Sequence, residues 1–111
     1  SGLAIRQRSM PSEELEDSLK SLRDEIDLID EEIIRKIAER MKISKRIGVY
    51  KKRNSVTILQ LARWEEIVRT RCAFGSSKEL EAEFVVELLR LIHSESIRLQ
   101  ERIMNSSPVD A

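Results

Sequence analysis

Two cationic side chains interrupt an apolar stripe in the first half of the chain. Arg40 and Lys51 are eleven residues apart, which is three helical turns with about 20° of drift, so on a helix they share one face. Ser44 and Gly48 lie between them and would leave a hollow under two long cationic arms. Such a face could bind an anion. The pattern alone favours the alternative, in which both cations reach solvent from the edge of the stripe.

Ser96 and Gln100 form a second polar interruption, near the end of the chain. They are four residues apart, so on a helix they lie on one face, with His93 one turn earlier. A buried polar group without a hydrogen-bond partner costs about 2 kcal/mol or more, so this pair needs partners. Facing Arg40 and Lys51, it would form a dry, anion-selective pocket between helices. A polar network in the core of a helical bundle is the alternative.

Other kinds of chemistry are poorly supplied. His93 is the only histidine, so we expect no metal site of the usual composition. The sequence has no glycine-rich phosphate loop and no Ser/His/Asp set. Gln60 has a structural explanation as part of a capping box that begins at Thr57, and Trp64 is more often a core anchor than a ligand contact.

The charge balance limits the partners that the chain could bind. Lys plus Arg number 20 and Asp plus Glu number 20, which argues against a bulk affinity for nucleic acid or for an anionic membrane surface. No apolar run approaches the roughly 20 residues that span a bilayer, and no segment resembles a signal peptide. We therefore expect a cytoplasmic protein.

The elements that must position these residues are helices. Charged residues make up 36% of the chain and aromatic residues 4%, with three glycines and two prolines, which favours an all-α fold. Apolar periodicity predicts a first helix over residues 12–53, a second from the Thr57 capping box to about Cys72 with Gly75 as the C′ residue, and a third that begins at a Ser76/Glu79 capping box.

The length of the first helix predicts a dimer. Forty helical residues span about 60 Å, whereas a compact domain of this size has a radius of gyration of about 13 Å. The apolar stripe nevertheless continues for nearly the whole helix. A second copy of the chain is the simplest way to bury this stripe. We therefore predict a three-helix chain with a very long first helix, intertwined as a homodimer.

The sequence resembles the helical chorismate mutases. The stretch LRDEID…LIDEEIIRKIAERMKISKRIGVYKK (22–52) resembles their first helix, and the similarity continues through Ala62-Arg63 to FVVELLRLIHSESIRLQ (84–100). AER…IGxxK followed by ESxxxQ at this separation is a fairly specific combination. The resemblance implies the Claisen rearrangement of chorismate to prephenate, in phenylalanine and tyrosine biosynthesis, with no cofactor.

Residue roles follow from the same resemblance, position by position. The catalytic residues are expected to be Lys51, Gln100 and Arg40. The substrate-binding residues are expected to be Arg23, Arg63, Ser96, Gln60 and Trp64. Arg23 matches an arginine that family members donate across the dimer interface. It is 17 residues from Arg40 on one helix, about 25 Å, so the two could not grip one small molecule in cis.

One position departs from the family pattern. Many members have Glu after the arginine of the second helix, where it accepts a hydrogen bond from the substrate's ring hydroxyl; this chain has Trp64. Trp64 keeps open a non-catalytic helical regulatory or binding module as an alternative to a mutase. An isochorismate-pyruvate lyase on the same fold is a second alternative.

The wording of the second helix, TILQLARW, and the N-terminal piece resemble the mutase domain fused to 3-deoxy-7-phosphoheptulonate synthase in some bacteria. That resemblance implies a fused synthase domain and a regulatory role in sensing prephenate. We expect residues 1–11 to be a linker remnant or a sequence left by cloning, residues 12–105 to be the mutase domain, and residues 106–111 to be a disordered tail.

Overall fold

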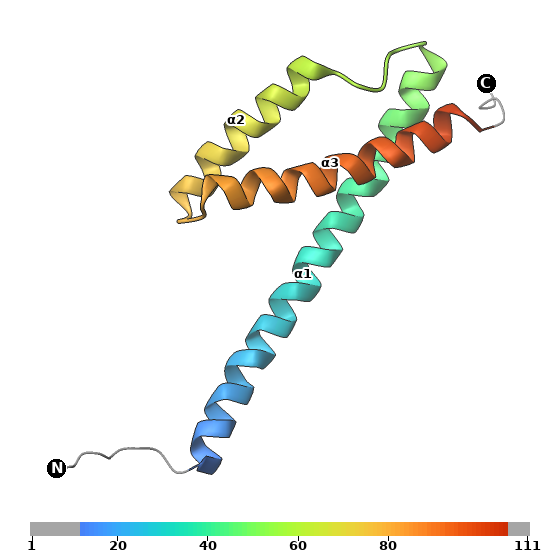
Figure 1. Cartoon of the computed structure of the whole chain (residues 1–111). Helices are drawn as coiled ribbons and strands as arrows, with labels where there is room; N and C mark the ends of the chain where they lie inside the picture. Colours follow the sequence, from blue (N-terminus) through green and yellow to red (C-terminus); the bar gives the residue numbers. More distant parts are fainter. Residues whose placement is uncertain (1–11, 107–111) are drawn as a thin grey trace. The chain divides into compact units, whose positions relative to one another are not determined.

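The structure is a computed structural model that describes residues 12–106. The expected linker over residues 1–11 and the tail over residues 107–111 lie outside the described residues. Three helices account for the fold: α1 (Ser12–Arg53), α2 (Leu61–Ser77) and α3 (Ala82–Met104) (Figure 1). No strand occurs between residues 12 and 106, which confirms the all-α prediction and the very long first helix. None of these helices is long and apolar enough to cross a membrane.

The sequence accounts for both ends of α1. Glu13 and Glu14 put negative charge in the first turn, and Lys51, Lys52 and Arg53 put positive charge in the last, and both complement the helix dipole. After Arg53 the chain turns at Ser55, which has a φ of 55°. The predicted bounds of this helix are therefore confirmed.

The starts predicted for the other two helices are wrong. α2 begins at Leu61, with Gln60 rather than Thr57 at the N-cap, and the Gln60 side chain donates from Nε2 to the Thr57 carbonyl oxygen at 2.7 Å. α3 begins at Ala82, after Glu81 at the N-cap. Glu79 could not act as an N3 residue because its φ of 64° places it in the turn between the helices.

Gly75 is also not the C′ residue of α2, because the helix continues through it to Ser77. The physical reason for a glycine here is close packing. A Cβ atom at Gly75 would lie 2.8 Å from Cγ2 of Val85 on α3, which is closer than real contacts allow. The small residue lets α2 and α3 approach where the hairpin between them turns.

The chain divides into two units, Ser1–Lys36 and Ile37–Ala111, and the boundary falls within α1. Every residue from 12 to 36 is exposed in this single chain, although the segment is rich in large apolar side chains. These exposed side chains are Leu15, Leu19, Leu22, Ile26, Leu28, Ile29, Ile33 and Ile34.

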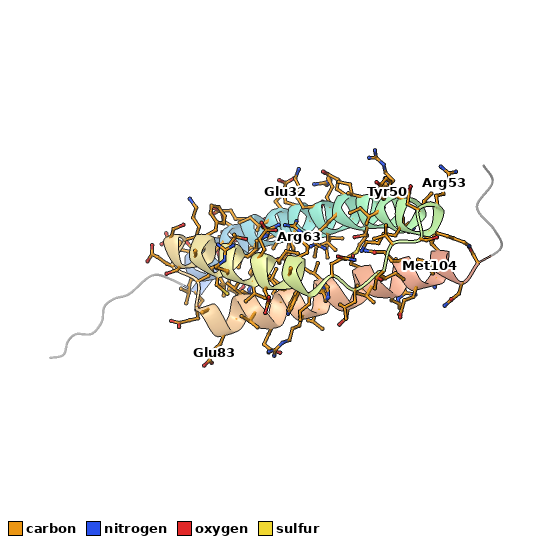
Figure 2. All side chains as sticks on the ribbon, turned by 90° about the horizontal axis from the view of Figure 1, so that it is seen from above. Glu32, Tyr50, Arg53, Arg63, Glu83 and Met104 are labelled. Carbon is orange, nitrogen blue, oxygen red and sulfur yellow. The ribbon has the colours of Figure 1, made fainter. Side chains whose placement is uncertain are left out.

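The second unit contains the core. Ile67 on α2 packs with Val85 and Leu89 on α3, and Trp64 and Cys72 pack against this cluster. At the other end of α3, the C-terminal ends of α1 and α3 lie side by side (Figures 1 and 2). There Lys52 Nζ donates to the carbonyl oxygen of Ile103 at 3.1 Å. The second unit thus holds the final turns of α1 against α3, and the site lies in this unit.

Candidate functional site

A cavity of about 390 Å³ lies in the second unit. Its walls come from the C-terminal part of α1, from the segment between α1 and α2, and from α2 and α3. Seven of the eight residues predicted as site residues line it: Arg40, Lys51, Gln60, Arg63, Trp64, Ser96 and Gln100. The eighth, Arg23, is exposed on the part of α1 that belongs to the first unit and is not among the lining residues.

A continuous hydrogen-bonded chain forms one wall of the cavity. The hydroxyl groups of Ser44 and Ser96 are 2.6 Å apart, and Gln100 Nε2 donates to the Ser96 oxygen at 3.2 Å. Lys51 Nζ donates to Gln100 Oε1 at 3.0 Å and to the carbonyl oxygen of Ile58 at 2.5 Å. Ser44, Ser96 and Gln100 are buried, so these bonds supply the partners that the polar interruptions required.

This network leaves donors for a ligand. The Gln100 amide has two N–H groups, and one of them bonds Ser96. The Lys51 ammonium has three, and two of them are used within the chain. Burial lowers the pKa of Lys51 from its ordinary value. The two side chains hold each other in place at the cavity wall and still offer donors to an oxygen atom placed between them.

Gly48 explains why α1 and α3 come close enough for this contact. A Cβ atom at Gly48 would lie 3.2 Å from Cα of Gln100 and 3.3 Å from its Cγ. Both distances are tighter than nearly all real contacts. The absence of a side chain therefore sets the spacing between Lys51, one turn further along α1, and Gln100.

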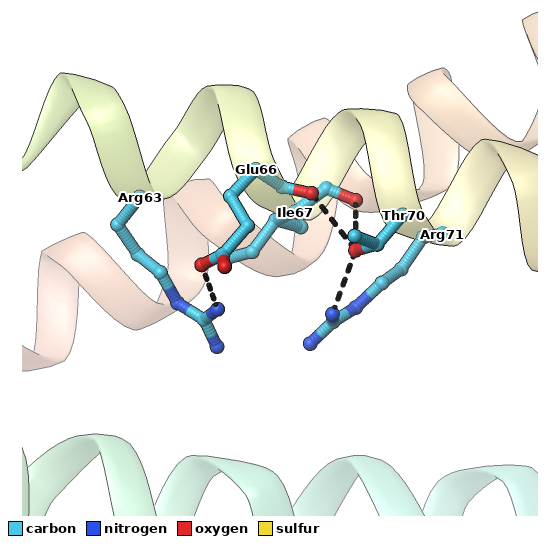
Figure 3. Close-up of polar contacts among 5 residues, drawn as sticks. All are labelled: Arg63, Glu66, Ile67, Thr70 and Arg71. Atoms are coloured by element: carbon cyan, nitrogen blue, oxygen red, sulfur yellow. Dashed lines mark hydrogen bonds and ion pairs between the residues drawn. The ribbon is translucent and has the colours of Figure 1, made fainter.

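Three other residues that line the cavity form an arginine cluster, defined here as Arg40, Arg63 and Arg71. Arg40 is half-buried, and its pKa is lowered by burial first, then by the nearby charges of Arg71 and Arg63. Arg63 donates to Glu66 at 2.7 Å on the surface of α2 (Figure 3). None of the residues that line the cavity carries a carboxylate, so the charged side chains in its lining are all positive.

Sequence reasoning missed Arg71. The signal was present, because Arg63, Ile67 and Arg71 are four residues apart in succession on α2, and Ile67 is buried. An arginine four residues after a buried position lies beside the same helix face. Arg71 lines the cavity, and its guanidinium donates to the Thr70 hydroxyl at 2.9 Å.

An aromatic pair closes another part of the wall. The rings of Trp64 and His93 lie 4.4 Å apart between centroids and are tilted by 30°. Trp64 packs against the core, as expected of an anchor, and also lines the cavity, while its contact with a ligand stays a prediction. The pKa of His93 is lowered by burial, by Arg40 and by Lys51. Its imidazole is consequently neutral near pH 7.

The arrangement fits a small organic dianion and little else. Guanidinium groups bind carboxylates through paired N–H donors, and the serine, glutamine and lysine groups add directed hydrogen bonds. The cavity offers no carboxylate to act as a base and no nucleophile with an activating partner. Its chemistry is binding, orientation and electrostatic stabilisation.

Comparison with known proteins agrees with this chemistry. The family model described as chorismate mutase type II matches residues 22–101. The chain belongs to the chorismate mutase type II family. The match runs from the first unit through all three helices and includes every site residue named above.

Individual relatives carry related names. The chain is 38% identical over 92 residues to a bifunctional chorismate mutase/prephenate dehydratase of Aquifex aeolicus and 30% identical over 87 residues to one of Buchnera aphidicola. Each match covers 78% of this chain, but only 25% and 23% of those relatives, so the chain spans about a quarter of their length. It is also 28% identical over 97 residues to a 4-amino-4-deoxychorismate mutase of Streptomyces venezuelae, covering 86% of this chain and 93% of that protein.

Proposed function

We propose that the chain catalyses the rearrangement of chorismate to prephenate. The observation that carries the proposal is the pair formed by Lys51 and Gln100, 3.0 Å apart, on the wall of a cavity that holds three arginines and no carboxylate. Chorismate has two carboxylates and one ether oxygen at the bond that breaks. The arginines match the carboxylates, and the Lys51/Gln100 pair matches the ether oxygen.

The reaction makes few chemical demands. It is unimolecular: one carbon–oxygen bond breaks as one carbon–carbon bond forms, with no proton transfer and no covalent intermediate. The protein must hold the folded conformer of the substrate and stabilise the negative charge that grows on the ether oxygen. Each fixed donor to such an oxygen contributes about 3–4 kcal/mol. The reaction therefore calls for no general base.

Arg40 and Arg63 would bind the carboxylates from within one chain. Arg63 is held on the surface by Glu66, so substrate binding would exchange one carboxylate partner for another. Ser96 would position Gln100 through the hydrogen bond that joins them. Gln60 and Trp64 would line the substrate without a role in the charge change.

Arg23 would enter from a second copy of the chain. The proposal is supported by the exposed large apolar side chains of residues 12–36, from Leu15 to Ile34. An apolar helix face of this extent is typical of an interface rather than of a solvated surface. In the proposed homodimer the partner subunit covers this face and brings Arg23 to the cavity.

We propose two alternatives for a domain fused to this chain in a longer protein. The printed names of the bifunctional relatives join a mutase to prephenate dehydratase, whereas the TILQLARW wording of this chain favours fusion to 3-deoxy-7-phosphoheptulonate synthase. In either setting the reaction would serve aromatic amino acid biosynthesis in the cytoplasm. With a synthase attached, the mutase unit would also report prephenate to that domain.

A product assay tests the function. Chorismate loss is followed by ultraviolet absorbance, and prephenate is detected after acid conversion to phenylpyruvate. Isochorismate is offered in parallel, with pyruvate release as the readout for a lyase. Prephenate formation supports the proposal. Pyruvate from isochorismate without prephenate formation would instead assign a lyase, and binding of prephenate without turnover of either substrate would assign a regulatory module.

A further inference from the structure

Arg71 is exposed, but it lacks the ion pair that four other arginines of this chain form. Arg35, Arg63, Arg90 and Arg98 each pair with a glutamate three residues away on the same helix. The corresponding positions around Arg71 are Ile67, Val68, Phe74 and Gly75, none of which is acidic. The carboxylate of Glu66, on the same helix, interacts with the charge of Arg71 but forms its hydrogen bond with Arg63. The one hydrogen bond of Arg71 is to the hydroxyl of Thr70, and no carboxylate between residues 12 and 106 forms a hydrogen bond or an ion pair with it.

The Arg71 side chain also points toward the cavity side of α2. Figure 3 shows the guanidinium groups of Arg63 and Arg71 both extending from α2 on the side that faces α1. Arg71 lines the cavity together with Arg40 of α1. Among the charges that act on Arg40, Arg71 is the larger influence and Arg63 the smaller.

Two guanidinium groups in one cavity repel each other, and the repulsion is stronger where water is partly excluded. Arg40 is half-buried, and no lining residue supplies a negative charge. An acidic side chain between Arg40 and Arg71 would therefore stabilise the protein without a ligand, but none of the residues that line the cavity is acidic. A bound anion between Arg40 and Arg71 would remove the repulsion and satisfy the donors of both groups.

We infer that Arg71 is a substrate-binding residue, which together with Arg40 holds one carboxylate of a dicarboxylate ligand within a single chain. The inference rests on the proposed function only for the identity of the ligand. In this arrangement Arg40 and Arg71 of the same chain bind one carboxylate. Arg23, by contrast, would come from the partner subunit.

The test compares Arg71→Gln with Arg69→Gln. Arg69 is exposed on α2, about 200° around the helix from Arg71, and does not line the cavity, so its substitution makes the same change in charge without touching the site. We expect Arg71→Gln to raise KM for chorismate about tenfold or more, with kcat changed much less, since the lost contact binds substrate and transition state alike. We expect Arg69→Gln to leave both values near those of the unmodified chain.

Arg71→Lys adds a second readout. It keeps the charge but loses the forked donor geometry, so its KM is expected to lie between those of the unmodified chain and Arg71→Gln. Matching thermal unfolding curves check that each variant is folded. A KM for Arg71→Gln equal to that of Arg69→Gln would overturn the inference.

Calorimetric binding of prephenate separates this inference from the proposed function. If the unmodified chain has no mutase activity but binds prephenate, and Arg71→Gln weakens that binding about tenfold, the proposed reaction fails and the role of Arg71 stands. If the chain turns over chorismate and Arg71→Gln binds prephenate as tightly as the unmodified chain, the reaction stands and the role of Arg71 fails.

Discussion

Lys51 Nζ of α1 donates to Gln100 Oε1 of α3 across 3.0 Å, and the same ammonium donates to the Ile58 carbonyl oxygen. The two contacts fix a flexible lysine side chain at the wall of the cavity before any ligand arrives. Preorganisation of this kind is what a site needs if it is to stabilise charge in a transition state without reorganising. The predictions below follow from this pair and its surroundings.

The neutrality of Gln100 predicts a flat pH profile. An amide donates at every relevant pH, so kcat under saturating chorismate should change little between about pH 5 and 8. Gln100→Glu should instead lose activity as the pH rises, since only the protonated carboxyl can donate. Lys51 at 3.0 Å would favour the ionised form and move this loss to lower pH. A steep loss of kcat in the unmodified chain on acidification from pH 7 to 5 would contradict the assignment.

Substitutions at Gly48 and Gly75 should both lower stability, but only the substitution at Gly48 should lower activity. Gly48→Ala would push α3 away at Gln100, so we expect a loss of stability of about 1–3 kcal/mol together with a clear fall in kcat. Gly75→Ala is the matched control, because its Cβ would collide with Val85 away from the cavity. It should lower the melting temperature and leave kcat nearly unchanged. Equal effects of both variants on kcat would show that Gly48 does not position Gln100.

The environment of His93 predicts proton uptake on ligand binding. Burial, Arg40 and Lys51 lower its pKa from the ordinary value of 6.5, so the free site holds a neutral imidazole near neutral pH. A bound dianion would offset both cations and raise that pKa, so affinity should rise as the pH falls toward 6. Calorimetric titration of prephenate in buffers of different ionisation enthalpy measures the uptake. His93→Phe should abolish it, and the same uptake in both proteins would assign it to another group.

The lowered pKa of His93 also has a consequence for folding. A histidine that holds its proton less tightly in the folded state destabilises that state as the pH falls below about 6.5, where the unfolded chain takes up the proton. Because the ring is only partly buried, the effect should be small.

The proposed donation of Arg23 across a dimer interface predicts complementation. Arg23→Ala and Arg40→Ala should each be nearly inactive alone. After the two variants are unfolded and refolded together, about half of the dimers should be mixed, and each mixed dimer has one site with both arginines intact. About a quarter of normal activity should therefore return. No recovery, in a mixture shown by sedimentation to contain dimers, would mean that Arg23 and Arg40 do not serve the same site from different chains.

The sequence predicted the parts of the structure that depend on long-range periodicity. The stripe along the first helix and the acidic and basic residues at its ends gave the bounds of α1. Local capping motifs were less reliable. The Gln60 side chain bonds back to the Thr57 carbonyl instead of capping a helix, and Gly75 is required by Val85, a contact that no local pattern contains.

The candidate site could be predicted to a similar extent. Polar residues that interrupt an apolar stripe stand out in a sequence, and Lys51, Ser96 and Gln100 were found in this way. The spacing of Arg71 from Ile67 was a signal, but spacing alone does not show whether an arginine on a helix flank faces solvent or a cavity. The packing of α2 against its neighbours decides which, and this depends on tertiary structure.

Lys51→Ala tests most directly whether Lys51 and Gln100 stabilise the breaking ether bond. Lys45→Ala is the control, since Lys45 is exposed on α1 and does not line the cavity. With chorismate at saturation, we expect kcat to fall about 100-fold or more for Lys51→Ala and to stay near normal for Lys45→Ala. Turnover by Lys51→Ala within about tenfold of the unmodified chain, a difference of about 1.4 kcal/mol, would contradict the claim.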